Sequence, residues 1–114
     1  MSGITTHVLD VSKGRPAAGV PVLLEVFLAD RGWVRLIERI TDADGRVRDF
    51  VAAGSALDAG RYRLTFDTAS YFAAQKVTGF YPLVPVVFEI LDPTQSYHVP
   101  LLLSPFGYST YRGS

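Results

Sequence analysis

The stretch that decides the fold is Tyr97–Leu103, YHVPLLL, together with the earlier run Leu83–Leu91, LVPVVFEIL. Both runs are far shorter than the about 20 apolar residues that a membrane-spanning helix needs, and we interpret them as strands. A half-buried strand should alternate apolar and polar residues, and these two runs barely alternate. The outward faces of a two-layer sandwich normally meet water. We therefore expect the outer face of one sheet to be covered by another subunit.

Further short segments with the character of strands fill the rest of the chain, separated by turn residues such as Gly14 and Gly32. One helix is predicted over 68–76, because Thr68 or Asp67 can cap it and its alanines favour helix. Gly79 lies just beyond, where a helix stop is expected. The other predicted strands are Ile4–Val11, Val20–Ala29, Trp33–Thr41, Arg46–Phe50 and Arg61–Asp67, with a loop over Ala52–Ala59. About seven or eight short strands with one helix predict an antiparallel β-sandwich.

Composition bounds the class of protein. The 114 residues suffice for a single domain over 1–114, and 48% hydrophobic residues is high for so small a monomer. Basic and acidic residues balance at 11 each without a basic stripe, so we expect no nucleic-acid partner. The absence of cysteine excludes disulfides, thiolate catalysis and cysteine-bound zinc. With no membrane span and no signal-like start, a soluble cytoplasmic protein is expected.

The chain has two histidines, His7 and His98, and both fall in predicted strands near its ends. Histidine is the usual general base near neutral pH, but position alone favours two structural histidines at strand surfaces. A catalytic zinc needs about three protein ligands, and two histidines without cysteine do not supply them, so no metal is expected.

Two further segments have both a structural and a functional interpretation. Asp42-Ala43-Asp44-Gly45 resembles the start of a calcium loop, but its glycine comes too early, and the turn interpretation is stronger. The tail is unusually aromatic for a chain end, with Phe106, Tyr108 and Tyr111. It either completes a sheet as an edge strand or lines a site. Composition and spacing alone lead no further than an oligomeric β-sandwich.

Three segments together resemble the 5-hydroxyisourate hydrolase family, also called transthyretin-related proteins. They are His7-Val8-Leu9-Asp10 with Gly14-Arg15-Pro16-Ala17, Thr41-Asp42-Ala43-Asp44-Gly45-Arg46, and Tyr97–Pro105 running on to the terminal Tyr111-Arg112-Gly113-Ser114. The terminal tetrapeptide is the most specific of these, whereas the second segment alone is weak because many sandwich modules carry it. The resemblance covers the whole chain in order.

The resemblance implies an all-β, transthyretin-like (prealbumin-like) sandwich of two four-stranded sheets with one short helix. It implies a homotetramer with active sites at the dimer–dimer interface. The implied activity is hydrolysis of 5-hydroxyisourate to 2-oxo-4-hydroxy-4-carboxy-5-ureidoimidazoline in urate degradation, without a cofactor. The implied catalytic residues are His7, Arg46, His98 and Ser114, and the implied substrate-binding residues are His7, Arg46, Tyr111, Arg112 and Gly113. The resemblance thus favours the catalytic interpretation of both histidines.

The chemistry suits these residue types. A histidine would activate water, with His7 the first choice and His98 its partner, and the always-charged Arg46 would stabilise the oxyanion. Tyr111 and the Ser114 end would hold the substrate or orient a histidine. Two rivals share the fold: a carrier of hydrophobic ligands, which does not need this polar set, and a prealbumin-like module of larger surface proteins.

Overall fold

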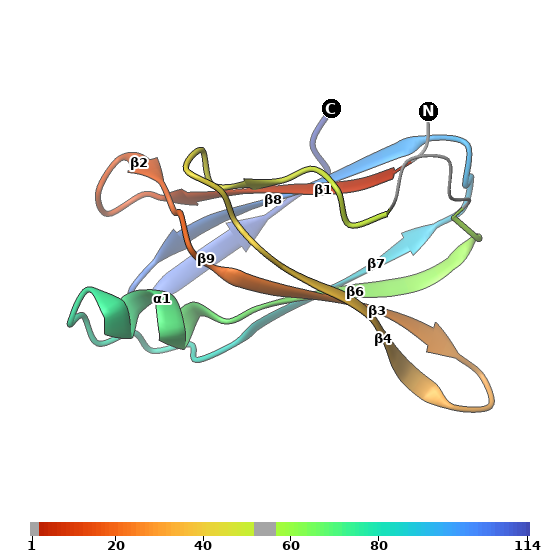
Figure 1. The fold of residues 1–114 in the computed structure, drawn as a ribbon, viewed down its shortest axis with the longest axis horizontal. Coiled ribbons are helices and arrows are strands. Elements are labelled where there is room, and N and C mark those ends of the chain that lie inside the picture. Colours follow the sequence, from red (N-terminus) through yellow and green to blue (C-terminus); the bar gives the residue numbers. More distant parts are fainter. Residues whose placement is uncertain (1–2, 52–56) are drawn as a thin grey trace.

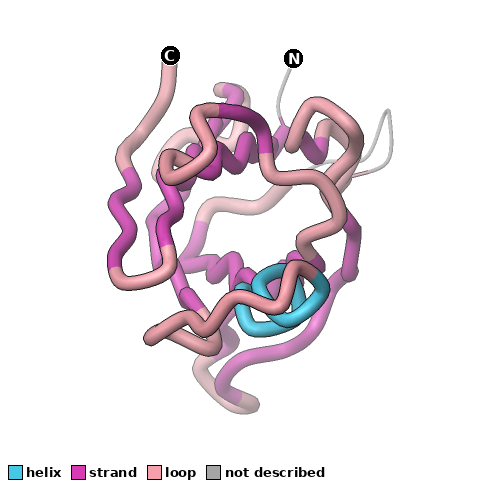
Figure 2. The backbone as a smooth tube through the Cα atoms, turned by 90° about the vertical axis from the view of Figure 1, so that its left-hand side faces the viewer, coloured by secondary structure: helices cyan, strands magenta, loops and turns pink. Residues whose placement is uncertain are grey.

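The computed structural model describes residues 3–51 and 57–114, and within them the chain forms two β-sheets packed face to face with one short helix at an end (Figure 1). The elements are β1 (Gly3–Asp10), β2 (Arg15–Pro16), β3 (Pro21–Leu28), β4 (Gly32–Ile40), β5 (Arg46–Val47), β6 (Gly60–Phe66), α1 (Thr68–Ala74), β7 (Val84–Ile90), β8 (Ser96–Ser104) and β9 (Gly107–Thr110). Seen from its end, the sandwich closes around its core with α1 against one layer (Figure 2). The predicted all-β sandwich with one short helix is confirmed for the described residues.

The two sheets differ in their number of strands. One sheet runs β4-β3-β6-β7 and has the predicted four strands. The other runs β2-β1-β8-β9 and has five strands, because the two-residue strand β5 also pairs with β1. Among the described strands all pairs are antiparallel except β1 with β8, which lie parallel from Gly3 opposite Ser96 to Asp10 opposite Leu103. The first and the penultimate strands of the chain therefore lie side by side.

The core follows from period-two patterning. In β1 the side chains of Ile4, Thr6, Val8 and Asp10 are buried, and the residues between them are half-buried on the outer face. In β6 the side chains of Tyr62, Leu64 and Phe66 point inwards in the same way. The fully buried aliphatic and aromatic residues from both sheets form one core cluster. Strands β1 and β6 thus separate an inward set of side chains that packs in the core from an outward set that the core does not use.

Local differences from the predicted bounds have physical reasons. The fourth predicted strand, Arg46–Phe50, pairs only over Arg46–Val47, and the buried Phe50 joins the core from a loop. The helix ends at Ala74 rather than Lys76, which has a positive φ of 58°. Gly79 is therefore not the helix stop; it packs against the ring of Phe72. Of the predicted loop Ala52–Ala59, residues 52–56 lie outside the described residues.

The two apolar runs Leu83–Leu91 and Tyr97–Leu103 show different burial patterns in the two sheets. Strand β7 does alternate, with Pro85, Val87 and Glu89 outward and exposed. Its Val87 side chain is 53% exposed, so part of this outer face is apolar. Strand β8 is buried at Val99, Pro100 and Leu101 in succession. Whether another subunit covers these outer faces stays a prediction.

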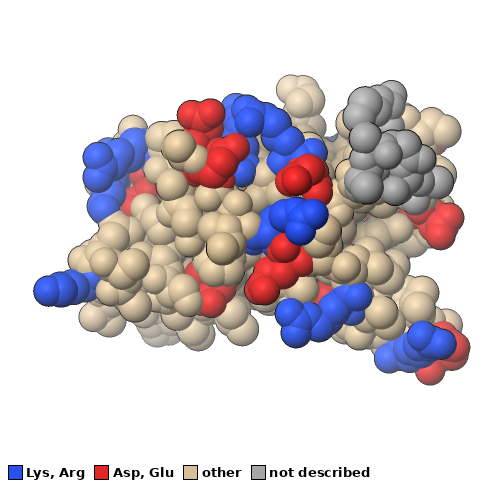
Figure 3. Space-filling view, in the orientation of Figure 1, with Lys and Arg blue, Asp and Glu red and all other residues tan. Residues whose placement is uncertain are grey.

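Basic and acidic side chains are interspersed over the upper and right-hand parts of the face that Figure 3 shows, and the lower left carries few charges. On the outer face of the four-stranded sheet, Arg63 pairs with Glu25 at 2.7 Å and Arg61 pairs with Glu89 at 2.8 Å. The guanidinium of Arg63 also lies 4.3 Å from the centre of the Trp33 ring. Among the described residues, no helix has the length and apolar character to cross a membrane.

Candidate functional site

His7 lies on the outer face of the five-stranded sheet. It is the fifth residue of β1 and belongs to the half-buried set that alternates with the buried one. Its partner across the antiparallel pairing with β5 is Arg46. Paired residues of neighbouring strands share a face, so Arg46 projects beside His7. Two residues that the sequence places 39 apart are thereby brought together.

The position of Arg46 is set by the tight turn before it. The Asp42 side-chain Oδ1 accepts hydrogen bonds from the backbone N–H of Asp44 at 2.9 Å and of Arg46 at 3.0 Å. The backbone hydrogen bond from Arg46 is the main reason that the pKa of Asp42 lies below its ordinary value. Gly45 has a φ of 73° and its carbonyl accepts from Val8 N–H at 2.7 Å. The Asp-Ala-Asp-Gly segment is therefore a turn that presents Arg46 to β1, as predicted.

His98 joins the same face from β8. Its parallel partner in β1 is Thr5, and the Thr5 Oγ1 lies 2.8 Å from the His98 Nδ1. Burial lowers the pKa of His98 below its ordinary value, and the nearby charges of Arg46 and His7 lower it further. His98 is therefore neutral near pH 7, which is the protonation state that a general base requires.

The C-terminal tail docks on this sheet. Strand β9 is the edge strand foreseen as one alternative for the tail, and it pairs with β8. The chain then continues past β9 to an isolated bridge, in which the Gly113 N–H donates to the His98 carbonyl at 2.8 Å. A Cβ at position 113 would lie only 2.5 Å from the Cδ2 of His98. Glycine at this position allows the tail to lie against the imidazole.

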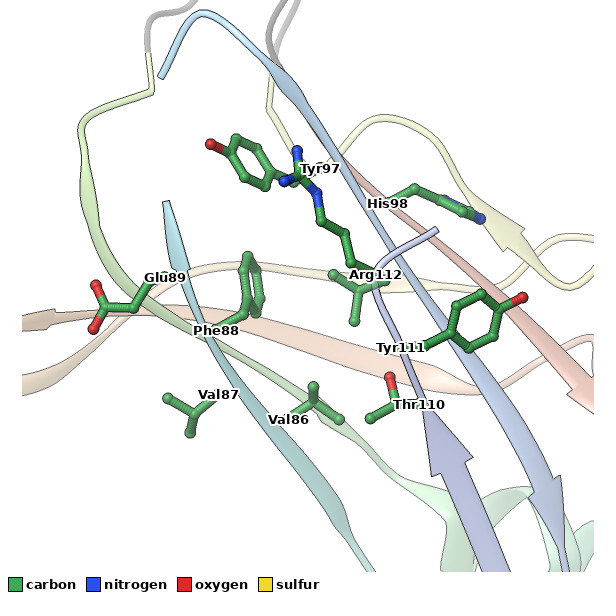
Figure 4. Close-up of a pocket in the computed structure, with 10 residues that line it drawn as sticks. Val86, Val87, Phe88, Glu89, Tyr97, His98, Thr110, Tyr111 and Arg112 are labelled. Atoms are coloured by element: carbon green, nitrogen blue, oxygen red, sulfur yellow. The ribbon is translucent and has the colours of Figure 1, made fainter. Parts of the chain in front are cut away.

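The tail side chains divide between two directions. In Figure 4, Tyr111 points to the same side as His98, and its side chain is exposed. Arg112 points the other way, with its guanidinium 4.6 Å from the centre of the Tyr97 ring and a 3.0 Å hydrogen bond to Gln95. Ser114 is exposed at the chain end. The structure therefore brings His7, Arg46, His98 and Gly113 together and places the Arg112 side chain elsewhere.

A cavity of about 250 Å³ lies beside this tail, between β7 and the β8 segment. Its walls include Val86, Phe88, Tyr97 and Arg112, with His98 at the margin (Figure 4). His7 and Arg46 do not line it; they stand on the open sheet face. In the described part of the chain no three histidine, aspartate or glutamate side chains gather as a metal site would need.

Two hydrogen bonds between described residues at the site were not foreseen from the sequence. One joins the side chains of Thr5 and His98, and the other joins those of Gln95 and Arg112. The contact of Thr5 with His98 could be predicted only if the register of β1 against β8 were known. Thr5 then shares the outward parity of His7.

Comparison with known proteins identifies the architecture. The sequence model of the HIUase/Transthyretin family matches residues 4–113. A Caenorhabditis elegans protein named "Probable 5-hydroxyisourate hydrolase" is 49% identical over 113 residues, covering 99% of this chain and 82% of that protein. The structure of Klebsiella pneumoniae 5-hydroxyisourate hydrolase is 38% identical, with a TM-score of 0.87 and full coverage of both chains (100% each). Sea bream transthyretin, solved in complex with thyroxine, is 34% identical, with a TM-score of 0.89 over 96% of this chain and 93% of that one.

Proposed function

This chain belongs to the HIUase/Transthyretin family, and we propose that it hydrolyses 5-hydroxyisourate to 2-oxo-4-hydroxy-4-carboxy-5-ureidoimidazoline, a step of urate degradation. The names and identities of its relatives support the substrate. The observation that carries the proposal is the convergence of His7, Arg46 and His98 on one sheet face, where the charges of two of them act on the third.

The chemistry needs a base that activates water, a group that stabilises the oxyanion and an acid that protonates the leaving nitrogen. It needs no cofactor, because the ring carbonyl of the substrate is already electrophilic. A histidine takes a proton from water while the water oxygen bonds to the carbonyl carbon. The carbon–nitrogen bond then breaks, the ring opens to a carboxylic acid, and the proton passes to the leaving ring nitrogen. Proton transfer by a placed side chain contributes typically about 10²- to 10⁴-fold. His7 and His98 are the two groups placed for it.

Arg46 is assigned to the developing oxyanion. Its guanidinium stays charged throughout the working pH range and offers a planar set of donors. A fixed donor aimed at such an oxygen is worth about 10²- to 10³-fold in kcat. Tyr111, Gly113 and the Ser114 end are assigned to holding the substrate, because Gly113 lies against His98 and Tyr111 points to the same side as His98 (Figure 4). For Arg112 we propose an indirect part, because its contacts with Tyr97 and Gln95 hold the tail in place.

One sheet face supplies only one wall of such a site. A hydrolytic site works best where bulk water is kept out and electrostatic interactions are strong. The outer face carrying His7 and His98 is open in the single chain, and Phe106 and Tyr108 expose apolar surface on the neighbouring β8–β9 hairpin. We propose that a second copy closes the face, in a homotetramer with sites at the dimer–dimer interface. Sedimentation and light scattering measure that assembly directly.

The test is the decay of 5-hydroxyisourate, generated from urate by urate oxidase, with and without the protein. We expect faster decay with the wild type and loss of most turnover in His7→Ala, Arg46→Ala and the deletion of residues 111–114. Arg35→Ala is the matched control, because Arg35 is exposed on the other sheet. Wild-type-like turnover in His7→Ala or Arg46→Ala would contradict the residue assignment. No acceleration by the folded wild-type assembly would contradict the substrate.

A carrier of hydrophobic ligands is the second candidate, because sea bream transthyretin bound to thyroxine has the same fold. The hydrolase is favoured by the higher identity to proteins of that name and by the polar character of the site. Tight binding of thyroxine without any effect on 5-hydroxyisourate decay would favour the carrier instead.

A further inference from the structure

The imidazole of His98 is held on two sides by groups from opposite ends of the chain. Thr5 Oγ1 lies 2.8 Å from Nδ1, in a hydrogen bond fixed by the parallel register of β1 and β8. On another side the tail backbone at Gly113 lies so close that an added Cβ would be 3.3 Å from Cγ and 2.5 Å from Cδ2. Within residues 3–51 and 57–114, no hydrogen bond to Nε2 is formed. Nε2 is thus the ring nitrogen left for a substrate or a water molecule.

We propose that Thr5 is a positioning residue that holds the proton on Nδ1 of His98 and so presents Nε2 as the nitrogen that takes a proton from water. This inference deepens the hydrolysis proposed above and rests on it. A threonine hydroxyl can accept from Nδ1–H both while the imidazole is neutral and after Nε2 has gained a proton. The ring therefore keeps one orientation through the whole proton transfer.

The same contact distinguishes the two histidines. His98 has a hydroxyl partner on one nitrogen and backbone against its edge, whereas His7 has no side-chain hydrogen bond within the described parts of the chain. A base whose second nitrogen is hydrogen-bonded keeps a fixed direction, and its tautomer follows from whether the partner accepts or donates. The proposal requires that the Thr5 hydroxyl accept from Nδ1–H. The sequence offered His7 as the first choice for water activation. The contact with Thr5 points instead to His98 for that step, with His7 beside it.

The test compares two substitutions at Thr5. Thr5→Val removes the hydroxyl and keeps the branched shape, whereas Thr5→Ser keeps the hydroxyl. We expect Thr5→Val to lower kcat by about tenfold to a hundredfold with little change in KM, in the range of other outer-shell partners. Thr5→Ser should keep kcat within about threefold. The control is Thr6→Val, the same change one residue along, where the hydroxyl donates to the Val99 carbonyl in the core and not to the site.

A second measurement is independent of turnover. Nitrogen-15 NMR of the wild type should show neutral His98 protonated on Nδ1, and Thr5→Val should shift the tautomer towards a mixture. A wild-type His98 protonated on Nε2 would overturn the proposal, and so would a Thr5→Val variant with unchanged tautomer and kcat. Equal losses in Thr5→Val and Thr5→Ser would also overturn it, because they would show a role of shape alone. If the wild type did not accelerate 5-hydroxyisourate decay, the proposed function would fail, while the NMR result would still decide the role of Thr5.

Discussion

Gly45 determines where Arg46 stands, and its replacement by alanine tests whether the turn builds the site. Gly45 has a φ of 73°, in the left-handed region that side chains disfavour by about 1–2 kcal/mol. A Cβ there would come closer than 3.0 Å to the Val8 carbonyl oxygen and to 3.1 Å from Ala17 N. Both neighbours are backbone atoms, so the turn must move. Overpacking of this kind costs a further amount of about 1–3 kcal/mol.

Gly14 provides a matched control for the strain alone. Its φ is 66°, but nothing lies within 4 Å of an added Cβ. Gly14→Ala should therefore cost about 1–2 kcal/mol, and Gly45→Ala about 2–5 kcal/mol in total. The clash alone should separate the two melting temperatures by about 4–12 °C, since a domain of this size loses about 4 °C per kcal/mol. Thermal unfolding must be compared at one protein concentration, because the proposed assembly would contribute to stability.

The functional part of this prediction concerns turnover. Shifting the turn should move Arg46 away from His7 and lower kcat by up to about a hundredfold, the value of one oxyanion donor. Gly14→Ala should leave kcat unchanged, since it lies outside the site. Melting temperatures of the two variants within 2 °C of each other (roughly 0.5 kcal/mol) would refute the clash. Normal kcat in a folded Gly45→Ala variant would refute the role of the turn in placing Arg46.

Three further perturbations test other contacts of the site and core. Arg46→Met should raise the pKa of His98 towards its ordinary value of 6.5 without fully restoring it, since burial remains the larger cause. NMR titration of His98 measures this pKa. An unchanged pKa would mean that Arg46 does not act on the ring. Because His98 must be neutral to act, the acid limb of the rate profile should move to higher pH in the same variant. Tyr71→Phe removes the 2.7 Å hydrogen bond to the buried Asp10 carboxylate and should cost about 1.5–3 kcal/mol in urea unfolding; a cost near zero would show that the bond contributes nothing net. Gly113→Ala should lower kcat while leaving the melting temperature within a few degrees, because the tail must leave His98 to make room for the Cβ; full activity would show that the docked tail is dispensable.

The sequence predicted the elements of the fold better than their pairing. Alternation along the predicted strand Ile4–Val11 and the cap at Asp67 follow from local chemistry, and both appear where expected. The parallel contact of β1 with β8 joins residues more than 90 positions apart, and no local pattern specifies it. Strand β2 was difficult to foresee because two residues leave no periodic signal, whereas β5 is the part of the predicted strand Arg46–Phe50 that pairs. Together with β1, β8 and β9, these two short strands make five in that sheet.

The candidate site was predicted through resemblance more than through residue chemistry. His7, Arg46 and His98 carry no shared spacing, and only the register of three strands brings them together. The roles of all site residues remain predictions. Arg112 illustrates the limit: a terminal arginine beside a site suggests a substrate contact, but in the single chain its guanidinium lies over the ring of Tyr97.

Strand β1 shows how one sandwich can present different side chains on its outer face. Its inward residues, among them Thr6 and Val8, are buried and specify the sandwich, whereas its outward residues Thr5 and His7 contribute little to the core. The adjacent threonines make the separation concrete, because one hydroxyl satisfies a core carbonyl of Val99 and the other meets His98. Because the two sets alternate, the outward residues can change without changing the packing. A protein with 34% identity can therefore keep the same sandwich while its outer face carries different chemistry.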